Sequence, residues 1–174
     1  KLDLHAVNLE KVFDSWTLQQ RDLLNPNSLG QPAYNIELKA NHEAIWQAGD
    51  IAEIQPGNSP ERIHAFLQKH HILKNSKVDS LQISIEKALW NKDLTGEIEP
   101  FANLDHLLEQ LPTLPTREYS IASIPSQQVL RLVVRQQYDA SGNLGLGSGW
   151  LTQHTQVNNE IALRIRTNEI GRAH

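Results

Sequence analysis

Apolar and polar residues alternate along several short segments of this chain, as they do in strands that bury one face. The clearest case is residues 34–39, Tyr-Asn-Ile-Glu-Leu-Lys, where every second side chain is apolar. The segments with strand-like texture are residues 34–39, 51–54, 117–123, 129–138 and 160–166. These segments predict strands toward both ends of the sequence, around a middle part of different texture.

The middle part has the spacing of helices. Residues 59–61, Ser-Pro-Glu, form a good helix start, with an N-cap, a proline at the first helical position and an acid in the first turn. Apolar residues then follow at helical spacing to about residue 71. Similar patterns predict further helices over residues 83–90 and 103–111.

Length and composition fit this division. The 174 residues suffice for one domain that carries an insertion, and 39% hydrophobic with 21% charged residues is ordinary for a globular protein. We therefore expect an antiparallel barrel or sandwich built from residues 1–58 and 113–168, with a helical insertion at residues 59–112.

Charge and residue usage exclude several kinds of function. The net charge of −4 and the pI near 6.1 argue against a surface that binds DNA or other nucleic acid. No apolar run is long enough to span a membrane, so a membrane partner is not indicated. The absence of cysteine excludes disulfides, thiolate metal sites and cysteine nucleophiles, and no histidine and carboxylate cluster has metal-ligand spacing.

The first segment with candidate chemistry is residues 117–123, Arg-Glu-Tyr-Ser-Ile-Ala-Ser. On a strand, Arg117 and Tyr119 point to one side and Ser120 to the other. An arginine fork can grip a phosphate with two charge-assisted hydrogen bonds, and a tyrosine offers a flat face and a hydroxyl. The alternative is an amphipathic strand with a surface arginine.

The second segment is residues 145–151, Gly-Leu-Gly-Ser-Gly-Trp-Leu. Glycines before a helix let the main chain approach a ligand, and amides at a helix start favour an anion. Ser148 is a natural N-cap for a helix over residues 148–155, although a serine-capped flexible loop is the alternative. Together the two segments would suit a dinucleotide that has a pyrophosphate and a flat ring.

These two segments resemble motifs of a known family. Residues 117–123 match the Arg-x-Tyr-Ser-Ile-Ala-Ser signature of FAD-binding domains in the ferredoxin–NADP reductase superfamily, in the form typical of the diflavin reductases. That branch includes cytochrome P-450 reductase and the sulfite reductase flavoprotein. Residues 145–151 resemble its Gly-rich segment, where Gly147 replaces the usual cysteine or alanine. The resemblance implies a mainly β, antiparallel six-stranded flavin-reductase barrel, and makes residues 59–112 a reduced connecting domain.

The resemblance also implies roles for individual residues. Arg117 would bind the FAD pyrophosphate, Tyr119 would contact the flavin and ribityl chain, and Ser120 would sit near flavin N5, where hydride arrives. The remaining cofactor-binding residues implied are Leu132 and Val134, largely through main chain, Tyr138 near the adenine, and Gly145, Leu146, Gly147 and Ser148 over the pyrophosphate.

The implied function is that of an FAD module in an NADPH-dependent flavoprotein reductase, which accepts hydride from NADPH and passes electrons to an FMN or flavodoxin-type carrier. Its partners would be an NADP-binding domain and an FMN domain, in the cytoplasm or at the cytoplasmic face of a membrane. Residues 169–174 would begin a downstream region, and this chain alone is expected not to oxidise NADPH at a useful rate. Two alternatives stay open: a single-flavin ferredoxin- or flavodoxin-NADP reductase, against which the insertion argues, and a non-catalytic scaffold barrel.

Overall fold

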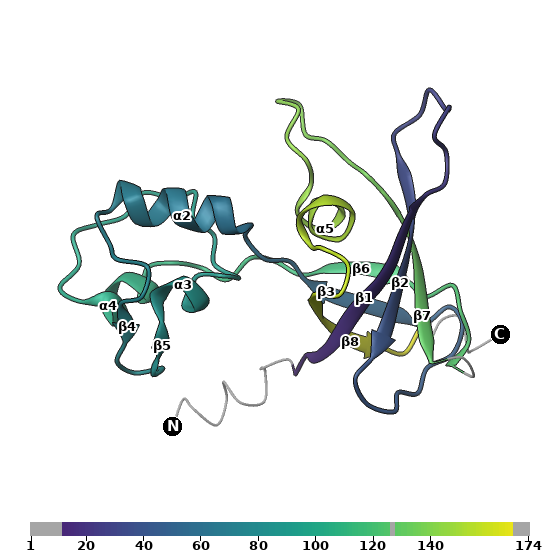
Figure 1. The fold of residues 1–174 in the computed structure, drawn as a ribbon, viewed down its shortest axis with the longest axis horizontal. Helices are drawn as coiled ribbons and strands as arrows, with labels where there is room; N and C mark the ends of the chain where they lie inside the picture. Colours follow the sequence, from purple (N-terminus) through teal and green to yellow (C-terminus); the bar gives the residue numbers. More distant parts are fainter. Residues whose placement is uncertain (1–11, 126–127, 169–174) are drawn as a thin grey trace.

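The computed structural model describes residues 12–125 and 128–168, and it places six strands in one antiparallel sheet (Figure 1). The order across the sheet is β6-β3-β8-β1-β2-β7. The strands are β1 (Asp14–Leu23), β2 (Ala33–Ala40), β3 (Ile51–Gln55), β6 (Arg117–Ser120), β7 (Val129–Arg135) and β8 (Glu160–Arg166). The mainly β, six-stranded fold expected from the sequence is thereby confirmed.

Alternation explains why these segments are strands. In β2 and β8 the central apolar positions, Ile36, Leu38, Ile161 and Leu163, are buried and the residues between them are more exposed, so each strand lays one face on a shared core. Fifteen of the described residues are buried in this core, among them Trp16, Leu38, Ile54, Leu132 and Leu163. The predicted strands over residues 117–123 and 129–138 are present but end earlier, at Ser120 and Arg135.

The two edge strands of the sheet meet at one end only. The Ala122 N–H donates to the Arg131 carbonyl at 2.9 Å. The Ser123 hydroxyl donates to the Val129 carbonyl and accepts from the Arg131 N–H, each at 2.9 Å. These bonds bring the edge strands β6 and β7 together and close the sheet into a barrel at this end.

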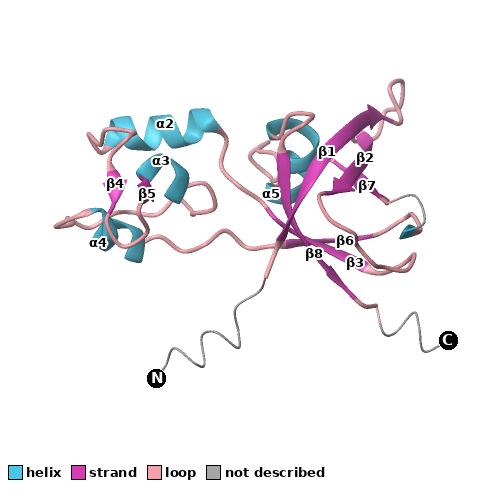
Figure 2. Cartoon of the chain, turned by 60° about the horizontal axis from the view of Figure 1, so that its bottom comes forward, coloured by secondary structure: helices cyan, strands magenta, loops and turns pink. Residues whose placement is uncertain are grey.

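The insertion has a small core of its own. It contains α2 (Pro60–Lys69), β4 (Lys77–Val78), β5 (Ile83–Ser84), α3 (Ile85–Ala88) and α4 (Leu104–Glu109). Its buried residues, which include Phe66, Val78, Leu89 and Leu107, form a cluster separate from that of the barrel. Figure 2 shows the two parts as distinct bodies joined by extended segments.

The helix starts in the insertion follow the capping rules, with one correction. The Ser59 hydroxyl accepts from the Arg62 N–H at 3.2 Å, which confirms the predicted start of α2. The helix predicted over residues 83–90 is wrong in its first turn. Residues 83–84 pair with β4, and the Ser84 hydroxyl caps a helix that begins at Ile85.

The joint between the two parts is polar and tightly packed. The Gln55 side-chain amide donates to the Leu114 carbonyl at 3.0 Å, and the Asn58 amide donates to the Leu89 and Lys92 carbonyls at 2.9 and 2.7 Å. Between them, Gly57 lies so close to the indoles of Trp90 and Trp150 that a Cβ would meet them at 2.6 and 2.9 Å. The segment after β3 thus fastens the insertion to the barrel.

Candidate functional site

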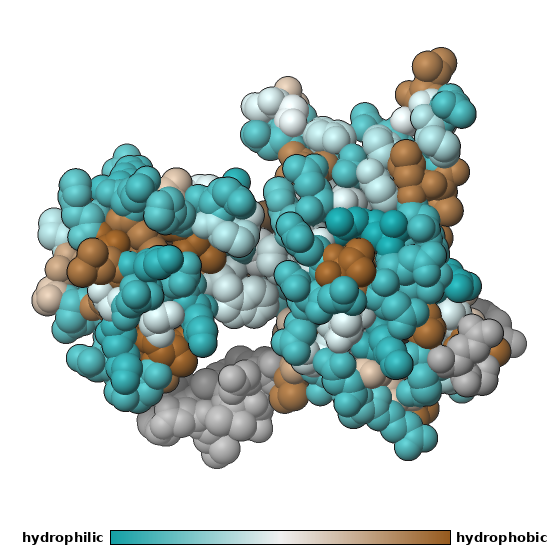
Figure 3. All heavy atoms as spheres, in the orientation of Figure 1, coloured by the Kyte–Doolittle hydropathy of each residue, from teal (hydrophilic) through white to brown (hydrophobic). Residues whose placement is uncertain are grey.

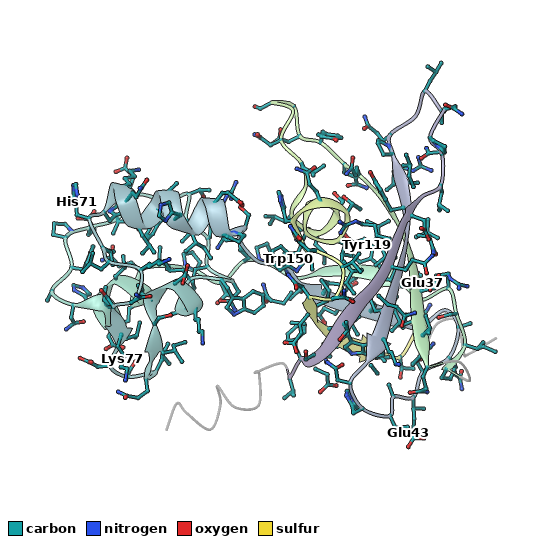
Figure 4. The ribbon with its side chains drawn as sticks, in the orientation of Figure 1. Glu37, Glu43, His71, Lys77, Tyr119 and Trp150 are labelled. Atoms are coloured by element: carbon teal, nitrogen blue, oxygen red, sulfur yellow. The ribbon has the colours of Figure 1, made fainter. Side chains whose placement is uncertain are left out.

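The structure brings the two candidate segments together. Gly147 lies directly against β6, where a Cβ would meet the Tyr119 hydroxyl oxygen at 2.4 Å and the Arg117 Cγ at 2.7 Å. Arg117 and Tyr119 share one side of their strand, as alternation predicts, and that side faces α5 (Leu146–Gly149). Figure 4 shows Tyr119 beneath α5. A side chain at position 147 would separate elements that here touch.

Tyr119 is held as a neutral hydroxyl. Burial raises the pKa of Tyr119 to about 12, and the nearby Arg117 guanidinium only partly opposes this shift. The phenol therefore stays protonated at physiological pH and can donate a hydrogen bond. Arg117 is exposed, and its guanidinium donates to the Thr116 carbonyl at 3.0 Å, which leaves most of its N–H groups available to a ligand.

Beyond the Ala122–Arg131 bond, β6 and β7 present unpaired edges to each other. The Ile121 N–H donates to the Asp50 carbonyl at 2.8 Å, on the β3 side. Because main-chain groups alternate in an antiparallel ladder, those of Glu118 and Ser120 point the other way, toward β7. Within the described residues, no main-chain hydrogen bond joins Glu118 or Ser120 to β7. We call the strip between these two edges the seam.

The opposite edge of the seam belongs to β7. The side chains of Leu132 and Val134 are fully buried in the barrel, and both residues pair with β2, opposite Ile36 and Tyr34. The Arg131 main chain points away from β2, so the same alternation turns Val133 and Arg135 toward the seam. Main-chain hydrogen bonds to a ligand there would come from these odd-numbered residues.

The sequence singled out Leu132 and Val134 instead of their neighbours. The sequence motif located the strand, but it did not show toward which neighbouring strand each main-chain N–H and C=O points. The roles predicted for these two residues stay predictions.

One end of the seam is covered by α5, whose start differs from the prediction. The N-cap is Gly145, with no side-chain cap, so the assignment of Ser148 as N-cap is wrong. Ser148 is buried within the helix, and its hydroxyl accepts from the Gln137 N–H at 3.2 Å. The Gly145 N–H donates to the Gln137 carbonyl at 2.7 Å, so α5 takes the place of a strand at this point of the β7 edge.

After α5 the chain continues as a short π-helix, Trp150–His154, rather than as one α-helix to residue 155. The Arg21 guanidinium donates to the Leu151 and Thr155 carbonyls, at 3.2 and 2.5 Å, and so ties this turn to β1. Tyr138 lies beyond β7, where its hydroxyl donates to the Gln136 side-chain oxygen at 3.0 Å and its ring is 46% exposed. A half-exposed ring at this position is available to stack on a ligand.

A network of charges lies on the outer face, beside Ser120. The buried Glu53 carboxylate accepts from Arg164 at 2.8 Å and from the Thr116 hydroxyl at 2.7 Å. Arg166 reaches across β3, contacts Glu53 at 3.4 Å and pairs with Glu118 on β6. Sequence reasoning missed this network because only the β6-β3-β8 order places these residues in one row.

Among the described residues, two cavities lie in and beside the insertion. One of about 590 Å³ lies between α2 and residues 94–98, and one of about 120 Å³ lies where α2 approaches α5. The face of the barrel in Figure 3 is mostly hydrophilic. Among the described residues, no three histidine and carboxylate side chains converge as metal ligands, and no helix is long and apolar enough to cross a membrane.

Comparisons with known proteins bear on the fold. Neither family models nor curated proteins match the sequence. Among solved structures, ferredoxin-NADP+ reductase from Plasmodium falciparum with 2'P-AMP matches 90% of this chain at 15% identity, with a TM-score of 0.52. A second structure of that enzyme matches the same share with a TM-score of 0.50. This chain spans only 39% and 38% of those chains.

The fold of this chain is therefore similar to that of part of a ferredoxin-NADP+ reductase. At this identity the similarity concerns the fold alone. Residues 59–112 make up nearly a third of the sequence, so a match over 90% of the chain must include part of the insertion. The sequence alone suggested that the insertion argues against a single-flavin reductase. The fold match over part of the insertion removes that argument.

Proposed function

We propose that the seam holds FAD, and that this chain is the flavin-binding module of an NADPH-dependent flavoprotein reductase. The observation that carries the proposal is the contact of Gly147 with Arg117 and Tyr119. It places an arginine fork, a protonated tyrosine hydroxyl and the start of α5 beside one another, which is the set of groups that a pyrophosphate and a ribityl chain require.

The residues of the seam fit such a cofactor. Glu118 and Ser120 on one edge and Val133 on the other offer main-chain donors and acceptors that no strand uses. Arg117 would grip the pyrophosphate, and Gly145–Ser148 would close over it. Ser120 would lie near flavin N5, and Tyr138 would lie near the adenine.

When bound, FAD supplies a site that accepts hydride and releases electrons singly. The chain's own residues would bind and orient it, and the Tyr119 hydroxyl would donate to it without ionising. NADPH would come from an NADP-binding domain in the same or a partner chain. The carrier that takes the electrons would be FMN on a flavodoxin-type domain, in the cytoplasm or at the cytoplasmic face of a membrane.

A single-flavin ferredoxin-NADP reductase is the second candidate, favoured by the fold similarity to a ferredoxin-NADP+ reductase. The two candidates differ in the electron acceptor. Chain loaded with FAD and reduced by dithionite can be mixed anaerobically with flavodoxin or with ferredoxin. Faster oxidation by flavodoxin supports the first candidate, and faster oxidation by ferredoxin supports the second.

Titration calorimetry with FAD and FMN tests the site itself. FMN lacks the second phosphate and the adenosine, so FAD should bind more tightly. Arg117→Ala removes a charge-assisted bond of about 1.5–3 kcal/mol, so FAD affinity should fall by about 10–150-fold. Arg117→Lys should restore only part of this, since lysine lacks the fork.

The control is Lys39→Ala, which removes an exposed cation from β2 and should leave FAD affinity unchanged. Equal affinity for both flavins, or an unchanged FAD dissociation constant in Arg117→Ala, would contradict the proposal. No binding of either flavin would leave the scaffold barrel as the function.

A further inference from the structure

A second region, at the joint of the barrel and the insertion, has the character of an anion site. The cavity of about 120 Å³ there has one wall from the start of α2 and one wall from the turn into α5. Its lining residues are Gly57, Asn58, Ser59, Arg62, Leu144, Gly145, Leu146 and His154. We call it the joint crevice.

The two titratable side chains that line the joint crevice are basic. Arg62 comes from the insertion and His154 from the π-helix of the barrel, and no carboxylate of a described residue forms an ion pair with Arg62. Two carboxylates act electrostatically on these side chains without forming an ion pair: Asp93 acts on Arg62, and Glu61 acts on His154. An arginine without an ion-pair partner, at the mouth of a polar hollow, retains its full fork for an anion.

The polar groups around Arg62 and His154 already make hydrogen bonds within the chain. The Ser59 hydroxyl is used by the Arg62 N–H, and the Asn58 amide is used by the Leu89 and Lys92 carbonyls. These bonds hold the backbone that carries Arg62, whose side chain lines both this crevice and the larger cavity beside α2. Burial and then the Arg62 charge lower the pKa of His154, which indicates that the two side chains lie within electrostatic reach.

We propose that the joint crevice binds a phosphate group, which Arg62 and His154 grip from its opposite walls. A phosphate between them would pair with the Arg62 guanidinium and would favour the protonated form of His154. The phosphate could belong to the cofactor of the proposed function or to a separate phosphate ligand. The crevice itself does not require that flavin binds.

Calorimetric titration of inorganic phosphate into the flavin-free chain tests the proposal. Arg62→Gln should weaken phosphate binding about tenfold or more, because a charged hydrogen-bonding partner is lost. His154→Gln, which keeps a hydrogen-bond donor, should weaken it less. Lys69→Gln is the matched control, since it removes the same charge from α2 two turns away and should leave phosphate binding unchanged.

Absence of phosphate binding, or an equal loss in Lys69→Gln and Arg62→Gln, would overturn the proposal. Repeating the titration on chain saturated with FAD distinguishes the sources. Loss of phosphate binding assigns the crevice to a cofactor phosphate, and retained binding assigns it to a separate phosphate ligand. FAD binding without phosphate binding would remove only this proposal, and phosphate binding without FAD binding would remove only the proposed function.

Discussion

The barrel and the insertion are stabilised in different ways. The barrel core collects buried apolar residues from five of the strands and Ile121 just after β6, and long ladders such as the seven pairs between β2 and β7 fix its register. The insertion has helices of 10, 4 and 6 residues and a ladder of two pairs, each too short to be stable alone. It therefore depends on its small core and on the amide clamps of Gln55 and Asn58.

The barrel can therefore position a site without the insertion, whereas the insertion takes its position from the barrel. Arg117, Tyr119 and Gly147 all belong to the barrel or to α5. The joint crevice draws residues from both parts. Perturbations of one part should then be visible in the other only when they act through the joint.

The largest effect on stability is expected when one buried leucine is truncated in one of the two cores. Leu107 is fully buried in the insertion, and Leu107→Ala should cost about 2–5 kcal/mol of local stability. Hydrogen exchange should then speed up in α2 and α4 while β2 and β8 keep their protection. The matched variant Leu163→Ala in the barrel core should reduce protection throughout. Equal loss in the barrel for Leu107→Ala would show that the two parts unfold as one.

A smaller effect is expected at the joint. In Gly57→Ala the new Cβ would lie 2.6 Å from the Trp90 ring and 3.0 Å from the Trp90 carbonyl, so the two parts must separate slightly. Overpacking of this kind costs about 1–3 kcal/mol. Tryptophan fluorescence should shift as the Trp90–Trp150 contact loosens. Gly96→Ala, where the Cβ meets nothing within 4 Å, is the control and should leave the spectrum unchanged.

Local pattern predicted most of the barrel, and its failures have physical causes. Strict alternation gave β2 and β8, and the Ser-Pro-Glu start gave α2. The strand β1 showed no clear alternation because its pairing register shifts between Leu18 and Gln20, and polar residues follow. Such an irregularity breaks the period of two on which the prediction rests.

The candidate site was predictable in part. Motif spacing indicated that Arg117, Tyr119 and Gly147 act together, and the structure places them in contact. The seam was not predictable, because which strand edges remain unpaired is a property of the β6-β3-β8-β1-β2-β7 order and not of any one segment. The same holds for Arg62 and His154, which lie more than 90 residues apart in the sequence.

A third prediction concerns a substitution at the candidate site of the barrel that does not contact the insertion. Gly147→Ala puts a Cβ 2.4 Å from the Tyr119 hydroxyl oxygen and 2.7 and 2.8 Å from the Arg117 Cγ and Cβ. Stability should fall by about 1–3 kcal/mol, the usual cost of overpacking, and FAD affinity should fall as well because Tyr119 and Arg117 are displaced. Urea unfolding and FAD titration of the same variant separate the two effects. A loss of stability with unchanged FAD affinity would place the flavin away from Tyr119.

The smallest effect concerns His154, which faces the insertion from the barrel, and its contribution to the pH dependence of stability. Burial, followed by the Arg62 charge, lowers the pKa of His154 below its usual value of 6.5, and Glu61 opposes this only in part. The unfolded chain therefore takes up a proton more readily than the folded chain. Stability should hold above pH 6.5, decline as the pH falls from 6.5 to the lowered pKa of His154, and level off below it, where both states hold the proton.

His154→Gln should flatten this decline, because the variant has no proton to take up at that position. Urea unfolding at pH 7.5 and pH 5 measures the difference, with His64→Gln on the exposed face of α2 as the control for loss of a histidine. An unchanged pH dependence in His154→Gln would show that His154 is solvated like an isolated histidine. Added phosphate should also reduce the decline if the joint crevice binds it, since the anion stabilises the protonated ring beside Arg62.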